Sequence, residues 1–360
     1  MRLVSLDVLR GLTVAGMILV NSAAAMKYGA AADVAPVLLH AHWDGLTIAD
    51  LVFPGFLTMV GIAIPFSLRG ADHGAAPYRR ILARGGRLLL LGFLLSNLYW
   101  FAHFDSGTWR LFGVLQRIGI VYAACAILFL TLGARARLVL VAVLLAAYWP
   151  LALLPSLDGL STDIWVRGHN FVASVDRALL GTHLYVPGLD GYDPEGILGT
   201  LPAIAQGLIG VAVGEMLIGR KERKTRRLAL AGAAILAVGL GWSLIFPIVK
   251  DIWSSPFVLV TSGITLLVLA ALHHWLDRDD RSPGLPATAM LAFGANAIAA
   301  YTLHQLTAEM VTWDLFLVPF RATRRTLGDP IASLLPILLY LGLIWAAMEA
   351  MRRRGWIIKI

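Results

Sequence analysis

Apolar runs of about twenty residues recur along this chain and limit its fold more than any other feature, because a helix of that length spans the hydrocarbon core of a bilayer. Only 14% of the residues are charged, whereas soluble domains contain about 25%. The sequence therefore predicts an all-α, polytopic membrane protein with about ten transmembrane helices in a single transmembrane domain, residues 1–360. The predicted spans lie near residues 8–26, 47–68, 87–104, 113–132, 138–155, 196–218, 228–247, 256–274, 287–305 and 331–350.

Lys and Arg residues are distributed unevenly between the two sides of these spans. If the N-terminus is cytoplasmic, 21 of the 30 Lys and Arg residues fall in cytoplasmic segments, and the C-terminus is cytoplasmic too. This asymmetry follows the positive-inside rule, so the net charge of +8 indicates topology rather than a nucleic-acid partner. Arg321, Arg324 and Arg325 are exceptions, because they fall in an external segment. The orientation places His40 on the periplasmic or external side.

The stretch from His40 to Pro54 begins as a polar cluster and continues as a long apolar run. His40, Trp43, Thr47 and Asp50 are spaced 3, 4 and 3 residues apart. If a helix already exists at Trp43, the last three of these share one face and His40 lies just above it. The pattern fits a functional site at the membrane surface. It fits equally an interfacial cap of Trp and His side chains above a buried, hydrogen-bonded Asp50.

Several other polar residues fall inside or at the ends of apolar spans, where they are costly and often functional. Asn21 closes the outer end of the first span, either as a hydrogen-bond donor or as a helix cap. Arg110 and Arg117 open the fourth span and suit an anion clamp or a tether to an external loop. Asn296 and His304 lie in the ninth span, and His304 is equally well explained as a hydrogen-bonded core histidine.

The longest external segment, residues 156–195, mixes aromatic and charged residues and ends with Asp193 and Glu195. Loops of this length are often functional. Aromatic rings stack on sugars and acids bind sugar hydroxyls, so the segment suits a sugar ligand, although a solvated lid is as good an explanation.

Metal and disulfide chemistry are not expected. The sequence His40-Ala-His42-Trp-Asp44 has ligand types that bind zinc, but no further ligand set accompanies it. Cys125 is the single cysteine and lies in an apolar run, so it forms no internal disulfide and is interpreted as a packing residue.

Six stretches resemble the transmembrane acetyltransferases typified by heparan-α-glucosaminide N-acetyltransferase, together with their bacterial relatives. The resemblance covers nearly the whole chain as a ten-span core. Its most specific parts are the runs from His40 to Pro54 and from Asp193 to Thr200. The six stretches are Ser5–Gly11, Met17–Asn21, His40–Pro54, Gly113–Arg117, Asp193–Thr200 and Gly294–His304.

The resemblance implies transfer of an acetyl group from cytoplasmic acetyl-CoA, as co-substrate, to the amine of a glucosamine across the membrane. His40 matches the family's catalytic histidine, and Asn21 matches an active-site asparagine. The implied partners are an amino sugar or glycan and the lipid bilayer of a bacterial inner membrane, and a homodimer is left open. The segment 22–39 is longer and less glycine-rich than in heparan-α-glucosaminide N-acetyltransferase, the lysosomal enzyme that typifies the family. The identity of the acceptor is therefore left open.

The implied reaction assigns a task to each residue of the site. An amine attacks a thioester only when unprotonated, so His40 is expected to act as the general base, or as a nucleophile that forms an acetyl-histidine. Asp50 is expected to orient the imidazole if the chain folds back far enough. Asn21 is expected to donate to the oxyanion of the tetrahedral intermediate.

Further residues are expected to bind the two substrates. The phosphates of CoA need cations, and the candidates are Arg79, Arg80, Arg84 and Arg117, although a positive-inside loop explains the first three equally well. The candidates for the acceptor are Trp43, Asp193, Glu195, Asn296 and His304. Two other functions fit the same composition: a sugar or amino-sugar permease, and an O-acetyltransferase of an envelope glycan.

Overall fold

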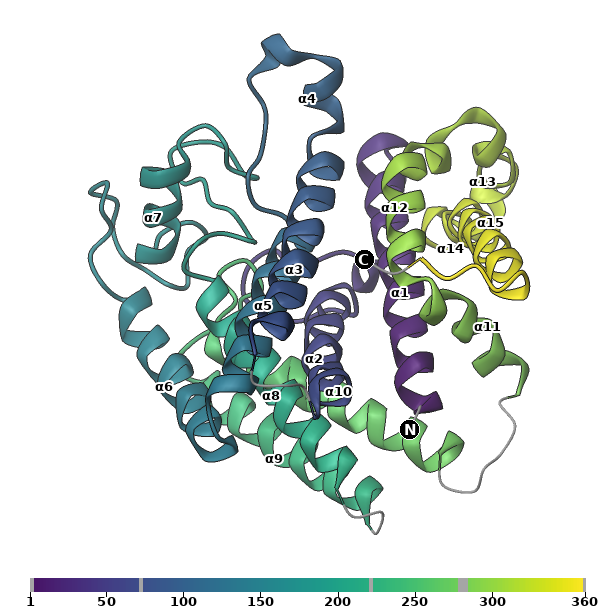
Figure 1. The fold of residues 1–360 in the computed structure, drawn as a ribbon. Coiled ribbons are helices and arrows are strands. Elements are labelled where there is room, and N and C mark those ends of the chain that lie inside the picture. Colours follow the sequence, from purple (N-terminus) through teal and green to yellow (C-terminus); the bar gives the residue numbers. More distant parts are fainter. Residues whose placement is uncertain (1–2, 71–73, 220–222, 278–283, 359–360) are drawn as a thin grey trace. The chain divides into compact units, whose positions relative to one another are not determined.

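Helices make up the secondary structure of the computed structural model, which describes residues 3–70, 74–219, 223–277 and 284–358 (Figure 1). Within these residues the only extended pairing is two isolated bridges, Asp44 with Val249 and Val186 with Tyr192. The all-α prediction is therefore confirmed for the described part of the chain. Some basic residues used for the topology prediction lie outside it: Arg2, Arg220, Lys221, Arg278, Arg281 and Lys359.

Fifteen α-helices and three short 3₁₀ turns follow one another along the described residues. The turns are Pro36–Leu38, Phe104–Ser106 and Ala308–Thr312. The helices are α1 (Val4–Gly29), α2 (Ala49–Leu68), α3 (Ala75–Ser96), α4 (Leu98–Ala102), α5 (Val114–Thr131), α6 (Ala134–Ala152), α7 (Phe171–Leu180), α8 (Thr200–Ile218), α9 (Lys224–Trp242), α10 (Ser255–Leu276), α11 (Leu285–Ala295), α12 (Ala297–Thr307), α13 (Asp314–Leu327), α14 (Asp329–Ala332) and α15 (Leu334–Arg353).

Seven helices of the described chain are long and apolar enough to cross a membrane, so the protein is a polytopic helical membrane protein. They are α1, α2, α5, α6, α8, α10 and the run formed by α14 and α15, Asp329–Arg353. The other three predicted spans correspond to α3 with α4, to α9, and to α11 with α12. Arginines occupy much of the first half of α3, basic residues begin α9, and Asn296 separates α11 from α12, which leaves shorter apolar segments.

The chain divides into two compact units. The first contains residues 1–41, 46–53 and 268–360, and the second contains residues 42–45 and 54–267. In the first unit, α1 packs along α11 and also contacts α12 and α15. Gly11 of α1 lies against the backbone of Met290, and Gly294 of α11 lies against the backbone of Asp7. Small residues at a helix contact allow this close approach, as in many membrane proteins.

In the second unit, α3 packs along α5, and α8 contacts both α5 and α6. Gly85 of α3 and Gly119 of α5 face each other: a Cβ added at Gly119 would lie 2.9 Å from the carbonyl oxygen of Gly85. Similarly, Gly61 of α2 lies against the backbone of Gly207 in α8. The helices of this unit are thus held by close backbone contacts as well as by side-chain packing.

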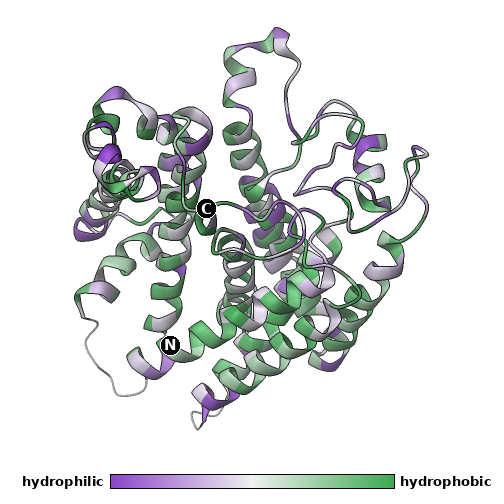
Figure 2. Ribbon diagram, turned by 180° about the vertical axis from the view of Figure 1, so that it is seen from behind, coloured by the Kyte–Doolittle hydropathy of each residue, from purple (hydrophilic) through white to green (hydrophobic). Residues whose placement is uncertain are grey.

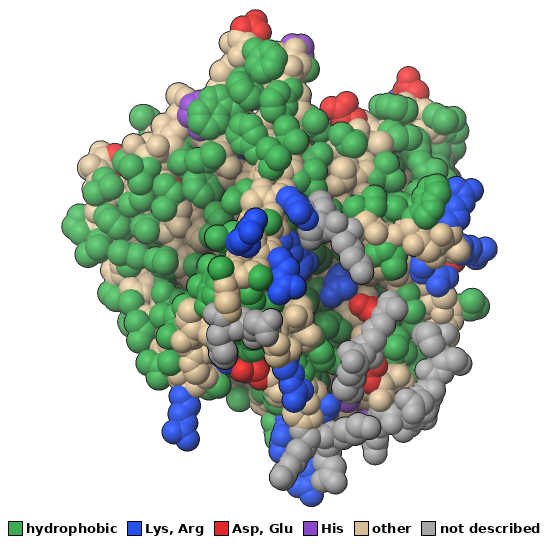
Figure 3. Space-filling model, viewed as in Figure 1, with side chains coloured by type: hydrophobic (Ala, Val, Ile, Leu, Met, Phe, Trp, Pro, Cys, Tyr) green, Lys and Arg blue, Asp and Glu red, His purple; other side chains and the backbone are tan. Residues whose placement is uncertain are grey.

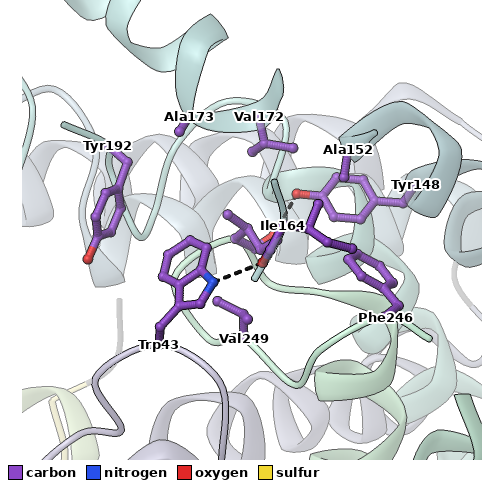
Figure 4. Close-up of a cluster of buried hydrophobic side chains, with 10 residues drawn as sticks. Trp43, Tyr148, Ala152, Ile164, Val172, Ala173, Tyr192, Phe246 and Val249 are labelled. Atoms are coloured by element: carbon purple, nitrogen blue, oxygen red, sulfur yellow. Dashed lines mark hydrogen bonds between the residues drawn. The ribbon is translucent and has the colours of Figure 1, made fainter. Parts of the chain in front are cut away.

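Hydrophobic residues run along the helices, whereas hydrophilic residues gather in loops and at helix ends (Figure 2). In the second unit a buried cluster joins the end of α6, the segment before α7 and the segment before α10 (Figure 4). Its members include Trp43, Tyr148, Ile164, Tyr192 and Phe246, all at most 6% exposed. This cluster fixes the long segment of residues 156–195 onto the helices of the second unit.

Candidate active site

An exposed histidine and a buried carboxylate meet in the first unit. The Nδ1 atom of His40 lies 2.7 Å from Oδ1 of Asp50, and the two side chains are 46% and 1% exposed. The chain therefore does fold back far enough for the contact that orientation of His40 by Asp50 requires. With Nδ1 directed at the carboxylate, Nε2 is the imidazole nitrogen left to meet a substrate.

The second oxygen of Asp50 receives hydrogen bonds from its own loop. Oδ2 accepts from the backbone N–H groups of Ala41 and Thr47, each at 3.0 Å. The Thr47 hydroxyl lies 3.0 Å from Oδ2 and 2.7 Å from the carbonyl oxygen of Leu39. A threonine three residues before an acid at the start of a helix resembles a capping box, and here the acid satisfies the backbone of the turn. These contacts fix the carboxylate independently of His40.

The expected helical face of Trp43, Thr47 and Asp50 is wrong, because α2 begins only at Ala49. Thr47 instead lies in the turn before the helix. Trp43 belongs to the second unit, where it is 6% exposed and its indole N–H donates to the carbonyl oxygen of Ile164 at 2.9 Å (Figure 4). Its ring also packs edge-on against Tyr192. Trp43 is thus part of the core, and its contact with an acceptor stays a prediction.

Asn21 belongs to a buried polar chain in the first unit. Its Nδ2 atom lies 3.2 Å from Nε2 of His304, and Nδ1 of His304 lies 3.1 Å from the hydroxyl of Tyr340. The Tyr340 hydroxyl is also 2.9 Å from Oγ1 of Thr307. His304 and Tyr340 are 1% and 0% exposed, whereas Asn21 is only partly buried. The geometry makes His304 a neighbour of Asn21; its direct binding of an acceptor stays a prediction.

Asn296 separates α11 from α12 and binds the chain's own C-terminal segment. Its Nδ2 donates to the carbonyl oxygen of Trp356 at 3.0 Å, and its Oδ1 accepts from the backbone N–H of Ile358 at 3.1 Å. The side chain is fully buried. Two hydrogen bonds of this kind mimic the pairing of a β-strand, so Asn296 holds an extended peptide. Binding of an acceptor by Asn296 stays a prediction.

Asp193 and Glu195 form an ion-pair network with Arg110 in the second unit. Nε and Nη2 of Arg110 donate to the two oxygens of Asp193 at 2.9 and 2.6 Å, and Nη2 also donates to Glu195 at 2.6 Å. Burial alone would lower the pKa of Arg110. Its hydrogen bonds to Asp193 and Glu195, together with the negative charges of both carboxylates, outweigh burial and raise this pKa. Burial also opposes ionisation of Glu195, yet Arg110 and Arg117 hold the pKa of its carboxyl below its usual range.

Arg117 is fully buried and contacts the same loop. Its Nη2 donates to the carbonyl oxygen of Gly196 at 3.0 Å, and its guanidinium lies 4.9 Å from the ring of Trp253. Arg110 precedes α5 while Arg117 lies within it, and both reach the loop between residues 193 and 199. The geometry supports the tether interpretation of this arginine pair. Binding of acceptor hydroxyls by Asp193 and Glu195, and of CoA by Arg117, stays a prediction.

Arg79, Arg80 and Arg84 are exposed along the first half of α3. Figure 3 shows Lys and Arg side chains gathered over this helix, on a face that is otherwise largely hydrophobic. The guanidinium of Arg84 lies 4.6 Å from the ring of Tyr122. Binding of CoA phosphates by these arginines stays a prediction.

Sequence reasoning missed Tyr340 and Thr307, which complete the polar chain around His304. A tyrosine within the last apolar run was the available signal, since a buried hydroxyl usually has a partner. Its partner could not be identified because Tyr340 and His304 are 36 residues apart.

Comparisons with known proteins point in one direction. The family model for the catalytic region of heparan-alpha-glucosaminide N-acetyltransferase matches residues 2–251. The heparan-alpha-glucosaminide N-acetyltransferase of Homo sapiens is 28% identical over an alignment 362 residues long, which covers 85% of this chain and 53% of the relative. That of Mus musculus is 27% identical over 361 residues, with the same coverage. The chain thus spans about half the length of these curated relatives.

Proposed function

Because the chain belongs to the heparan-alpha-glucosaminide N-acetyltransferase family, we propose that it transfers an acetyl group from acetyl-CoA to the amine of glucosamine or of a glucosamine-terminated saccharide. The observation that carries this proposal is the pair of His40 and Asp50, in which an exposed imidazole is bonded to a buried carboxylate. A general base for amine acylation needs this combination of access to substrate and fixed orientation.

The pair defines how the proton moves. Nδ1–H of His40 donates to Asp50, so the lone pair of Nε2 accepts the proton of the amine as its nitrogen attacks the thioester carbonyl. The C–N bond forms, the C–S bond breaks, and the CoA thiolate leaves. The imidazolium formed at His40 is stabilised by the adjacent carboxylate and returns its proton to the thiolate or to water. In the covalent alternative, Nε2 itself attacks the thioester and the CoA thiolate leaves. The amine then attacks the acetyl-imidazole, and the imidazole of His40 is the leaving group.

Asn21 is the proposed donor to the oxyanion of the tetrahedral intermediate. Its partial exposure, and the use of one N–H by His304, support this role, because an amide nitrogen carries a second N–H. Loss of one such donor typically costs about 2.7–4 kcal/mol in transition-state stabilisation.

The donor is proposed to enter from the cytoplasmic side, where the phosphates of CoA meet Arg79, Arg80 and Arg84. This rests on a topology of ten spans with both termini in the cytoplasm of a bacterial inner membrane. The distribution of Lys and Arg supports it. An impermeant thiol reagent added to intact cells should then label Ser161→Cys and spare Arg226→Cys, and the reverse pattern would overturn the topology.

Purified protein with labelled acetyl-CoA tests the activity. Glucosamine and a glucosamine-terminated oligosaccharide should accept label, whereas N-acetylglucosamine, whose amine is blocked, should not. Label on N-acetylglucosamine would indicate O-acetylation instead. Counterflow of an amino sugar in proteoliposomes, without consumption of acetyl-CoA, would contradict the transferase proposal and indicate a permease.

A further inference from the structure

The polar chain that joins α1, α12 and α15 in the first unit has a definite order of protons. Thr307 has one hydroxyl proton, and its Oγ1 lies 2.7 Å from the carbonyl oxygen of Leu303. That short distance assigns the proton to Leu303. The Tyr340 hydroxyl then has two acceptors for its proton: Oγ1 of Thr307 at 2.9 Å, which has lone pairs left to accept, and the carbonyl oxygen of His304 at 3.4 Å.

This order determines the tautomer of His304. With the Tyr340 proton on either of these two acceptors, the Tyr340 oxygen accepts at 3.1 Å from Nδ1–H of His304. Nε2 of His304 then carries a lone pair. At 3.2 Å from Nε2, the Asn21 side chain must present its NH₂ group rather than its oxygen. Each donor of the buried members His304 and Tyr340 therefore has an acceptor, as a buried polar network requires.

We propose that His304, Tyr340 and Thr307 are positioning residues that fix which end of the Asn21 amide faces the reacting atoms. Asn21 and Thr307, at the two ends of this chain, are partly exposed, whereas His304 and Tyr340 between them are buried. With one N–H bound to His304, the second N–H of the same nitrogen points away from it and is available to an oxyanion. A flipped amide would offer its oxygen there and repel the developing negative charge. This inference rests on the proposed function, in which Asn21 is the oxyanion donor.

Two substitutions at His304 separate positioning from packing. In His304→Gln, a side-chain oxygen reaches the place of Nε2 and can accept from Asn21. In His304→Asn, the amide nitrogen takes the place of Nδ1 and keeps the bond to Tyr340, but no acceptor faces Asn21. Positioning predicts that Gln keeps kcat within a few-fold of wild type, whereas Asn lowers kcat by roughly 10- to 100-fold, a part of the loss seen when an oxyanion donor is removed.

KM for acetyl-CoA should be unchanged in both variants, because Asn21 would act on the transition state. In an Asn21→Ala background, His304→Asn should cause no further loss of kcat. If His304 had a structural role alone, the order of the two kcat values would be reversed, because His304→Asn preserves the bond to Tyr340 and His304→Gln does not. The reversed order, or equal losses in the presence and absence of Asn21, would overturn the inference.

A second measurement reads the proton order without activity. Protein labelled with ¹⁵N-histidine, with His304 assigned by its loss in His304→Gln, should show Nδ1 protonated and Nε2 unprotonated. Tyr340→Phe removes the acceptor for Nδ1–H and should shift His304 toward the other tautomer. Protonated Nε2 in wild type would overturn the inference. A wild type that shows the expected tautomer but transfers no acetyl group would overturn the proposed function and leave the proton order standing.

Discussion

Asp50 lies beneath His40, with Oδ1 2.7 Å from Nδ1 of the imidazole, and its other oxygen is bound by the turn that begins α2. The carboxylate is thus fixed whether or not His40 is present, and it determines which imidazole nitrogen meets a substrate. This relationship allows the role of Asp50 to be tested apart from its contribution to folding.

Asp50→Asn should fold but turn over slowly. The amide oxygen can still accept from Ala41 and Thr47, which places the NH₂ group against Nδ1 of His40. Nδ1 then has to accept, Nε2 carries the proton, and the base is lost. An equivalent change in serine proteases lowers kcat about 10⁴-fold, so we expect a loss of roughly 10²- to 10⁴-fold here.

Asp44→Asn is the matched control, because Asp44 is an exposed acid six residues away whose Oδ1 accepts from Ile248. It should keep kcat near wild type. Thermal unfolding in detergent should be similar for both variants. If Asp50→Asn is unfolded, Asp50 is a structural acid, and if it is fully active, the orienting role is contradicted.

Asp176 of α7 should make the stability of the second unit depend on pH. Burial raises the pKa of its carboxyl to about 7, assisted by Asp193 and opposed by the hydrogen bond from Ile197 and by Arg117. In the unfolded chain the carboxyl ionises near pH 3.9. Between about pH 4 and pH 7 the unfolded state therefore loses its proton first, and the free energy of unfolding should fall as pH rises.

Asp176→Asn should remove this fall, measured by thermal unfolding from pH 4 to pH 8. Asp158 is a control whose pKa is shifted in the opposite direction, because its hydrogen bond from Arg177 lowers the pKa of its carboxyl. Asp158→Asn should therefore remove stability that is present at neutral pH and lost on acidification. A wild type and an Asp176→Asn variant with parallel stability profiles would contradict the assignment.

Gly61→Ala should destabilise the second unit. A Cβ at Gly61 would collide with the backbone of Gly207 in α8, and backbone cannot move aside as a flexible side chain can. Such overpacking typically costs about 1–3 kcal/mol. Gly86 of α3 is the control, because a Cβ added there would meet open space. Gly86→Ala should therefore be neutral or stabilising. Equal thermal unfolding of the two variants in detergent would show that the α2–α8 contact is looser than described.

Asn296→Ala should release the C-terminal segment. Both hydrogen bonds to Trp356 and Ile358 are lost, so carboxypeptidase should remove residues 356–358 faster than in wild type. KM for the acceptor should stay unchanged if holding this segment is the main role of Asn296. A raised KM with unchanged digestion would instead support the acceptor-binding role predicted from sequence.

Much of the fold follows from local sequence, because apolar runs and their flanking charges identify helices wherever those runs are long. The predicted span 47–68 begins close to α2, but the sequence left open whether the helix already exists at Trp43, and it does not. Asp50 satisfies the backbone of Ala41 and Thr47, so the turn persists until Ala49. The division at Asn296 was also missed, since the residue that separates α11 from α12 is stabilised by a segment 60 residues away.

The candidate site shows the same limit. Asp50 was expected to orient His40 only if the chain folded back far enough, and the contact between the two side chains is present. Asp193 and Glu195 were selected for their chemistry and for the family motif that begins at Asp193. Their pairing with Arg110, over 80 residues away, depends on tertiary structure. Polar residues in a membrane chain are thus easy to find, whereas their partners are not.

Acetyl transfer to glucosamine by His40→Ala and His42→Ala tests the central claim most directly. The two histidines lie two residues apart and both are exposed, but His40 is the one bound to Asp50. Both variants should unfold at temperatures close to that of wild type. With labelled acetyl-CoA, His40→Ala should lose measurable transfer while His42→Ala keeps most of the wild-type rate. Near-normal turnover by His40→Ala would contradict both the general-base route and the acetyl-histidine route.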